Sequence, residues 1–145
     1  MSIALYIPFF VQFVVITVDE FYFHWRRGLP RWERLGHPLD TLTVIAALAY
    51  PLIFPFSRTH LACYSALAAF SAFFVTKDEF VHKECCSAHE QWLHALLFLN
   101  HPLVLIAVAF LWVKGASLFL VTQLVAGLLF CFYQTIYWNF IWKQG

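Results

Sequence analysis

Long apolar stretches separated by short polar connections run the whole length of the chain. A membrane-spanning helix needs about 20 residues, and the apolar stretches are long enough to meet this requirement. The pattern predicts helices with approximate bounds 2–23, 33–56, 60–82, 88–113 and 117–142. Pro, Gly and basic residues fill the connections, as is typical of turns. We therefore expect an all-α integral membrane protein with five transmembrane helices in a single domain, residues 1–145.

The composition agrees with this fold class. Hydrophobic residues make up 62% of the chain and charged residues only 12%, whereas soluble domains carry about 25% charged residues. The first residues lack the basic start and the small-residue cleavage site of a secretory signal, so we interpret them as the first membrane helix. The formal net charge of +1 gives no electrostatic basis for binding nucleic acid. Membrane lipid is the expected environment.

One polar pattern occurs twice in the chain. An Asp-Glu-Phe triplet is followed by a His, a polar connection, and then a Glu with a His four residues later. The first copy contains Asp19, Glu20, His24, Glu33 and His37, and the second contains Asp78, Glu79, His82, Glu90 and His94. Seven of the eight acidic residues of the chain fall within the two copies, and the eighth, Asp40, follows His37 by three residues. We predict a tandem two-helix repeat, with repeat A at about 1–58, repeat B at about 59–114, and an extra C-terminal helix at about 115–143.

Basic residues are distributed unevenly between the two ends of the predicted helices. Seven of the nine lie at the end that carries both motif copies: Arg26, Arg27, Arg31, Arg34, Lys77, Lys83 and Lys143. Only Arg58 and Lys114 lie at the opposite end. The positive-inside rule then predicts an outside N-terminus, with the motif copies and the C-terminus on the cytoplasmic side of a bacterial inner membrane or a similar one. The two repeats would be related by a pseudo-two-fold axis along the membrane normal.

The spacing of the carboxylates and imidazoles indicates a metal site. Residues three or four apart share one face of a helix, so each of four helix ends would present one Glu and one His to a common side. The predicted ligands are Glu20, His24, Glu33, His37, Glu79, His82, Glu90 and His94. Ionised groups at membrane depth are costly and usually pair inside the bundle. This inventory predicts two divalent metal ions close to the cytoplasmic face.

The chemistry of the donors narrows the choice of metal. Mixed carboxylate and imidazole donors suit iron or zinc, with manganese as a further candidate, whereas calcium prefers oxygen donors alone. Four more residues are candidates for ligands or for hydrogen-bonding supports of the ligands: Asp19, Asp78, Asp40 and His89. The roles of Cys85 and Cys86, which are adjacent in the second polar connection, stay open.

The element Glu79-x-x-His82 resembles the Glu-x-x-His element of ferritin-like di-iron carboxylate bundles. The resemblance covers this motif and not the whole chain, and Glu20-x-x-x-His24 departs from it by one residue. What the resemblance implies is a dinuclear centre held between four helices.

Several functions are compatible with such a centre. The first is a membrane metalloenzyme for a lipid or another apolar substrate, which would oxidise, hydroxylate or desaturate it with iron, or hydrolyse it with zinc. The alternatives are transport or sensing of metal ions or protons, and a structural metal clamp without catalysis. A metal-free network of ion pairs with the neighbouring arginines is the simplest alternative. The outer halves of the helices are mostly apolar, which argues against transport. The oligomeric state is left undetermined.

Overall fold

The computed structural model describes residues 2–80 and 86–142, apart from the side chain of Asp78. The described residues form helices and short turns, without a strand among them. The elements are η1 (Ile3–Leu5), α1 (Ile7–Val18), η2 (Asp19–His24), α2 (Trp25–Arg27), α3 (Arg31–Ile53), α4 (Arg58–Phe74), η3 (Val75–Asp78), α6 (Ala88–Val113), α7 (Ser117–Ile136) and η4 (Tyr137–Ile141). The segments from η1 to α2 follow one another as a single rod, as do α7 and η4.

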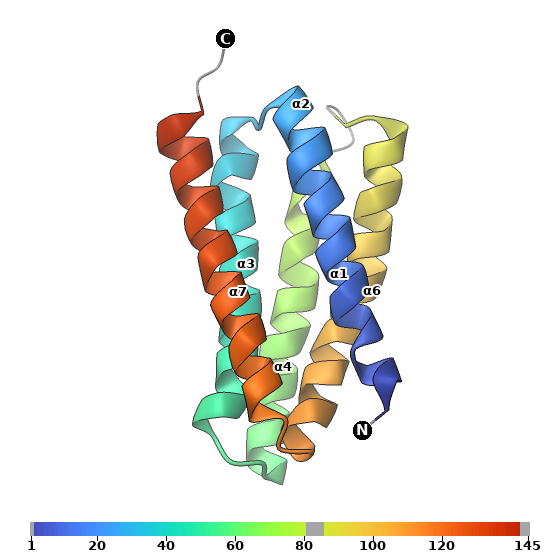
Figure 1. Cartoon of the computed structure of the whole chain (residues 1–145), viewed down its shortest axis with the longest axis vertical. Helices are drawn as coiled ribbons and strands as arrows, with labels where there is room; N and C mark the ends of the chain where they lie inside the picture. The colour runs from blue at the N-terminus through green and yellow to red at the C-terminus, as the bar shows by residue number, and fades with distance from the viewer. Residues whose placement is uncertain (1, 81–85, 143–145) are drawn as a thin grey trace.

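The long helices lie side by side in a bundle and alternate in direction along the chain (Figure 1). We call the end that carries α2 and the start of α6 the motif end. The start of α3 and the described C-terminal part of the chain lie at this end as well, whereas the N-terminus lies at the opposite, far end. The helix that bears the first motif copy and the helix that bears Glu90 and His94 therefore bring their polar ends to the same level.

Four helical segments are long and apolar enough to cross a membrane: Ile3–Arg27, Arg58–Lys77, Ala88–Val113 and Ser117–Ile141. The fifth long helix, α3, begins with charged residues and is not among the four. Large apolar side chains such as Phe13 and Phe73 are 69% and 76% exposed on the outside of the bundle. A soluble bundle would bury such a surface, so these findings indicate membrane insertion.

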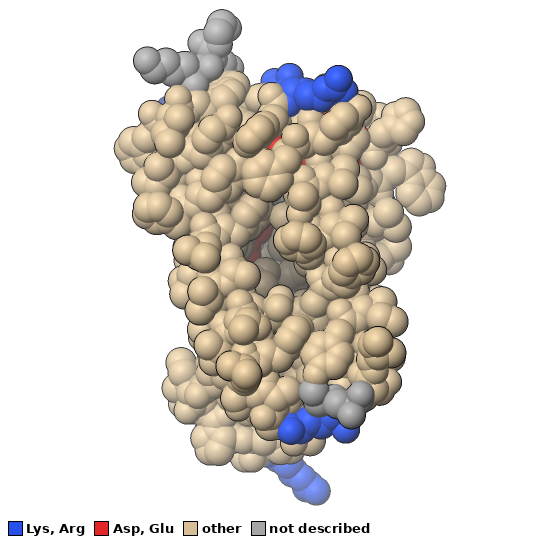
Figure 2. Space-filling model, viewed as in Figure 1, with Lys and Arg blue, Asp and Glu red and all other residues tan. Residues whose placement is uncertain are grey.

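Charge is concentrated at the ends of the bundle and in its interior. Figure 2 shows Lys and Arg atoms at both ends and apolar or uncharged atoms between them. Few acidic atoms are visible on this face. Six of the buried polar residues, Asp19, Glu20, His24, Glu33, Glu90 and His94, belong to the two motif copies. The acidic motif residues of the first rod and of α6 thus point inward, as expected for ionisable groups in a membrane helix.

The hydrophobic core fills the far half of the bundle. It contains Ala47 and Leu48 of α3, Tyr64 of α4, and Val108 and Leu111 of α6, all of them buried. Here α1 packs chiefly against α6, and α3 packs against α7 and α4. The apolar half thus fixes the helices in place, and the polar half above it contains the motif residues.

Gly28 makes the turn that sends α3 back along the bundle. Its φ of 75° lies in the left-handed region, which favours glycine. A Cβ atom at this position would approach Trp142 Cζ2 to 2.4 Å. Both the backbone conformation and the close packing therefore require glycine, and α3 can start directly after Pro30.

The predicted repeat has no direct counterpart in the packing. α1 and α3, the two helices of repeat A, do not pack extensively on each other in the described structure, because each has its main contacts with other helices. The two Asp-Glu-Phe triplets also begin in different helix types, since Asp19 opens a π-helical segment and Asp78 ends a 3₁₀ segment. The tandem repeat stays a prediction.

Candidate metal centre

The first motif copy lies on a π-helical segment, η2. The backbone N–H of Trp25 donates to the carbonyl of Glu20, five residues earlier. This wider turn brings side chains five apart onto one face, so Asp19 and His24 point the same way. The Asp19 Oδ2 atom lies 3.3 Å from His24 Nε2, and Glu20 Oε2 lies 3.4 Å from His24 Nδ1. One imidazole is therefore held between two carboxylates of its own helix.

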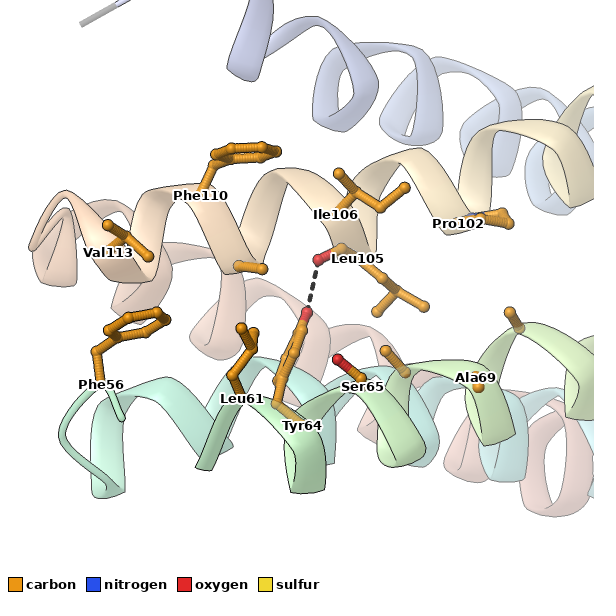
Figure 3. Close-up of a pocket in the computed structure, with 13 residues that line it drawn as sticks. Phe56, Leu61, Tyr64, Ser65, Ala69, Pro102, Leu105, Ile106, Phe110 and Val113 are labelled. Atoms are coloured by element: carbon orange, nitrogen blue, oxygen red, sulfur yellow. Dashed lines mark hydrogen bonds between the residues drawn. The ribbon is translucent and has the colours of Figure 1, made fainter. Parts of the chain in front are cut away.

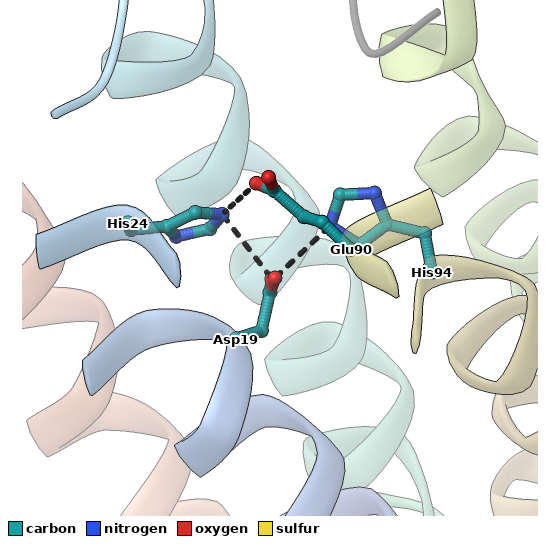
Figure 4. Close-up of side chains that lie close together, drawn as sticks. All are labelled: Asp19, His24, Glu90 and His94. Carbon is teal, nitrogen blue, oxygen red and sulfur yellow. Dashed lines mark hydrogen bonds and ion pairs between the residues drawn. The ribbon is translucent and has the colours of Figure 1, made fainter. Parts of the chain in front are cut away.

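Two residues of α6 complete the first group of candidate ligands (Figure 4). Glu90 and His94 are four residues apart and share one face of the helix. His94 Nε2 lies 3.0 Å from Asp19 Oδ1, and Glu90 Oε1 lies 4.0 Å from His24 Nε2. One ligand atom from each of the four buried residues lies within 4.8 Å of all the others. This group could hold a metal ion.

The Nε2 atom of His24 is buried and makes no hydrogen bond to the described residues, although carboxylate oxygens of two helices surround it. Buried polar atoms normally have a hydrogen-bonding partner. A ring nitrogen surrounded by carboxylate oxygens has an arrangement that suits either a proton on the nitrogen or a cation between the groups. Two imidazoles and two carboxylates are also a donor set that zinc, iron and manganese accept, so the residues present fit a transition metal.

A second group shares His24 with the first. It consists of Glu20, His24 and His37, whose ligand atoms again lie within 4.8 Å of one another. The rings of His24 and His37 meet edge to face, with centroids 4.8 Å apart. Trp138 Nε1 donates to Glu20 Oε1 at 2.6 Å, and both side chains are buried. Trp138 lies in η4, the second π-helical segment, and its hydrogen bond fixes the carboxylate that faces His24 Nδ1.

Arg27 connects the centre to a further carboxylate. Its Nε and Nη2 atoms donate to Glu90 Oε1 at 3.1 and 2.9 Å. Its Nη1 and Nη2 atoms donate to the two oxygens of Glu33 at 3.3 and 2.8 Å. Such a fork of donors is the strongest form of ion pair. It holds Glu90 in place within the first group, whereas Glu33 belongs to neither group.

The charges of this region do not balance among the described side chains. Four carboxylates are buried in this region, those of Asp19, Glu20, Glu33 and Glu90, and Arg27 forms ion pairs with two of them, Glu33 and Glu90. The four ionised carboxylates and Arg27 together carry three negative charges when the imidazoles are neutral. Isolated ions in a low-dielectric interior are strongly unfavourable, so the region requires protons on its imidazoles or carboxylates, or bound cations.

The remaining predicted residues lie elsewhere. Glu79 is exposed and belongs to neither group. His89 is also exposed, and together with Glu90 it lines a pocket of about 610 Å³. Asp40 forms an ion pair with Lys77, whose Nζ lies 2.7 Å from Asp40 Oδ2. His82 lies outside the described residues, as does the side chain of Asp78.

Two residues of the centre were missing from the predicted set. Arg27 follows His24 by three residues and so shares its face of the helix. This spacing could have identified Arg27 as a neighbour of the candidate ligands. Trp138 belongs to a group of aromatic residues near the chain end that is typical of membrane interfaces. Nothing in that group marks Trp138 as the one that points inward.

The geometry thus brings Asp19, Glu20, His24, His37, Glu90 and His94 together in two overlapping groups. The first rod contributes three of these residues, α6 two and α3 one. Searches for relatives add nothing to this assignment, since no protein-family model, curated protein or solved structure matches the chain.

Proposed function

We propose that the chain is an integral membrane metalloprotein whose resident divalent transition metal ion is held by Asp19, His24, Glu90 and His94. The observation that carries the proposal is the convergence of these four buried ligand atoms, all within 4.8 Å of one another, from two helices. The excess of buried carboxylates over cations supports it, because a divalent ion would remove most of that excess.

The number of ions depends on His24. A neutral imidazole offers one lone pair and one N–H, so His24 serves as ligand in only one of the two groups. With Nε2 directed to the first group, Nδ1–H donates to Glu20, which is the usual carboxylate support of a metal-bound imidazole. We therefore propose one complete site in the first group. The second predicted ion would have Glu20 and His37 as its ligands, and a metal content of two per chain would support it.

We further propose that the centre acts as an enzyme on an apolar or amphiphilic substrate. When bound, the ion would supply a Lewis acid, with redox chemistry in the case of iron and an activated water in the case of zinc. The pocket that Glu90 lines gives a route of approach, with Tyr22, Phe23 and Arg26 among its other lining residues. Arg27 also lines this pocket and would hold Glu90 in a fixed orientation toward the ion.

A transport function receives less support. Below the metal-binding groups, Thr43, Ser71 and His101 form a short hydrogen-bonded series, with Ser71 Oγ 2.7 Å from Thr43 Oγ1 and 3.0 Å from His101 Nε2. The core beyond it is closed by Val108 and Leu111, both fully buried. A polar path across the whole bilayer is therefore not formed by residues 2–80 and 86–142.

The metal-free ion-pair network is the alternative that a specific observation favours, namely the four hydrogen bonds of Arg27 to Glu33 and Glu90.

Metal analysis distinguishes the metal centre from the metal-free ion-pair network. We expect protein purified without added metal to contain zinc, iron or manganese at a ratio near one or two per chain. His94→Ala should lose most of it, whereas the matched control His89→Ala, at an exposed position, should retain it. Metal-free wild-type protein, or equal metal in both variants, would contradict the proposal.

The catalytic part needs a separate test. Metal-loaded protein in lipid nanodiscs can be assayed for dioxygen consumption with iron and for release of fatty acid from ester-linked lipids with zinc. Turnover that His94→Ala abolishes and His89→Ala keeps is the expected result. A fully loaded protein without either activity would leave a structural clamp as the function and overturn the enzyme proposal.

A further inference from the structure

An apolar groove runs between α4 and α6 in the far half of the bundle (Figure 3). Its volume is about 400 Å³. Small residues of α4 form one wall and larger apolar residues of α6 the other, among them Ser65, Ala69, Ala72, Pro102, Ile106 and Phe110. The hydroxyl of Tyr64 donates to the carbonyl of Leu105 at 2.6 Å across the base of the groove. A ligand would therefore meet an almost entirely apolar surface.

The dimensions of the groove match one leaflet of a bilayer. Its lining extends along α6 from Pro102 to Val113, which corresponds to about 16 Å at a rise of about 1.5 Å per residue. Half of the hydrocarbon core of a bilayer is about 15 Å thick. Ile106, Phe110 and Val113 are 53%, 54% and 56% exposed, so the groove opens sideways to the surrounding lipid. An extended acyl chain that enters from the far end would end near Ala72.

Two basic residues stand where the groove reaches the far end. Arg58 is the first residue of α4, and Lys114 directly follows the last residue of α6. Both are exposed. The chain has no acidic residue between Asp40 and Asp78 or after Glu90, so the sequence provides no carboxylate for them at this end. An anionic group at the membrane surface would complement this pair.

We propose that the groove binds one acyl chain of an anionic phospholipid, with the phosphate at Arg58 and Lys114. The site lies in the opposite half of the bundle from the metal centre and does not depend on it. A second copy of this chain is the other occupant that small residues on a membrane helix can accept. Two copies joined through this face by a two-fold axis along the membrane normal would place both pairs of basic residues at one level. Charge repulsion disfavours that arrangement, whereas a phosphate is attracted.

The test measures lipid binding by the intact protein. Protein reconstituted in nanodiscs of phosphatidylcholine, with or without phosphatidylglycerol, is released and examined by native mass spectrometry. We expect one retained phosphatidylglycerol per chain and a higher melting temperature in its presence. Ala69→Leu fills the groove and should remove both effects. Ala66→Leu, an exposed alanine of the same helix outside the groove, is the matched control and should keep them.

The basic pair is tested by the double variant Arg58→Gln and Lys114→Gln, whose exposed positions leave the packing intact. Each basic side chain near a membrane surface contributes about 1 kcal/mol to the binding of anionic lipid. The preference for phosphatidylglycerol should therefore fall by about 30-fold. Equal retention of both lipids by the wild type, or an unchanged preference in the double variant, would overturn the proposal. A dimer that Ala69→Leu dissociates would do so as well, in favour of the second copy.

Discussion

Replacing Arg27 by Gln tests the electrostatics of the centre. The Arg27 side chain is 18% exposed, and its partners Glu33 and Glu90 are 0% and 3% exposed. Removal of one partner from a buried ion pair costs about 3–5 kcal/mol, because the remaining charge is left without compensation. Two carboxylates lose their cation here, so we expect Arg27→Gln to lower the free energy of unfolding of the metal-free protein by about 3–5 kcal/mol. A bound ion would still compensate Glu90 but not Glu33, so the cost should fall to roughly half with metal present.

The assay is reversible unfolding in mixed micelles of mild detergent and dodecyl sulfate, with and without a chelator. Arg26→Gln is the matched control, since Arg26 is the exposed neighbour and donates to the Tyr22 hydroxyl. Its loss should cost less than about 1 kcal/mol. Adding Glu33→Gln to the Arg27→Gln variant should restore part of the stability, because it removes one uncompensated charge. Equal costs for the two arginine variants would show that Arg27 does not stabilise the protein by neutralising Glu33 and Glu90.

Three further variants test the surroundings of the centre and the packing below it. Trp138→Phe removes the hydrogen bond to Glu20 and should weaken metal binding by about 10–100-fold, as measured by competition with a chelating dye; an unchanged affinity would show that Glu20 does not support a ligand. Gly28→Ala places a methyl group against the Trp142 ring at a positive φ and should lower the free energy of unfolding by about 1–3 kcal/mol, whereas Gly115→Ala, with open space around it, should lower it less. Ser71→Ala leaves a buried imidazole nitrogen without its partner and should cost about 1–3 kcal/mol in the same unfolding assay; a cost below about 0.5 kcal/mol would contradict this.

The long apolar stretches and the turn residues between them were sufficient to predict the long helices. The predicted bounds 88–113 are those of α6, because Ser87 caps the helix by accepting from the Glu90 N–H and Gly115 follows its end. The second helix was expected at 33–56, but α3 spans Arg31–Ile53. Pro30 sets the start of α3, and its end at Ile53 precedes Pro55 by two residues, as the restricted backbone before a proline favours.

The sequence predicted the types of ligand in the candidate site, but not which residues supply them. Counting positions on a regular α-helix paired Glu20 with His24 and left Asp19 as a support. The π-helical turn instead adds Asp19 to the ligand face, and the sequence contains no signal for that turn. The second triplet has the same three residue types, but its Asp78 is the last residue of a tighter 3₁₀ segment, Val75–Asp78. The next residue, Glu79, is exposed. Departures from α-helical geometry in opposite directions thus distinguish the two Asp-Glu-Phe triplets, which are identical in sequence.

X-ray absorption at the edge of the metal found in purified protein tests whether the ion is bound by Asp19, His24, Glu90 and His94. We expect nitrogen and oxygen ligands only, at about 2.0–2.2 Å, with the multiple-scattering signature of two imidazoles from His24 and His94. His94→Ala with metal added back should retain one imidazole at most. A protein without bound metal, or a first coordination shell with sulfur at about 2.3 Å, would contradict the assignment of the ion to Asp19, His24, Glu90 and His94.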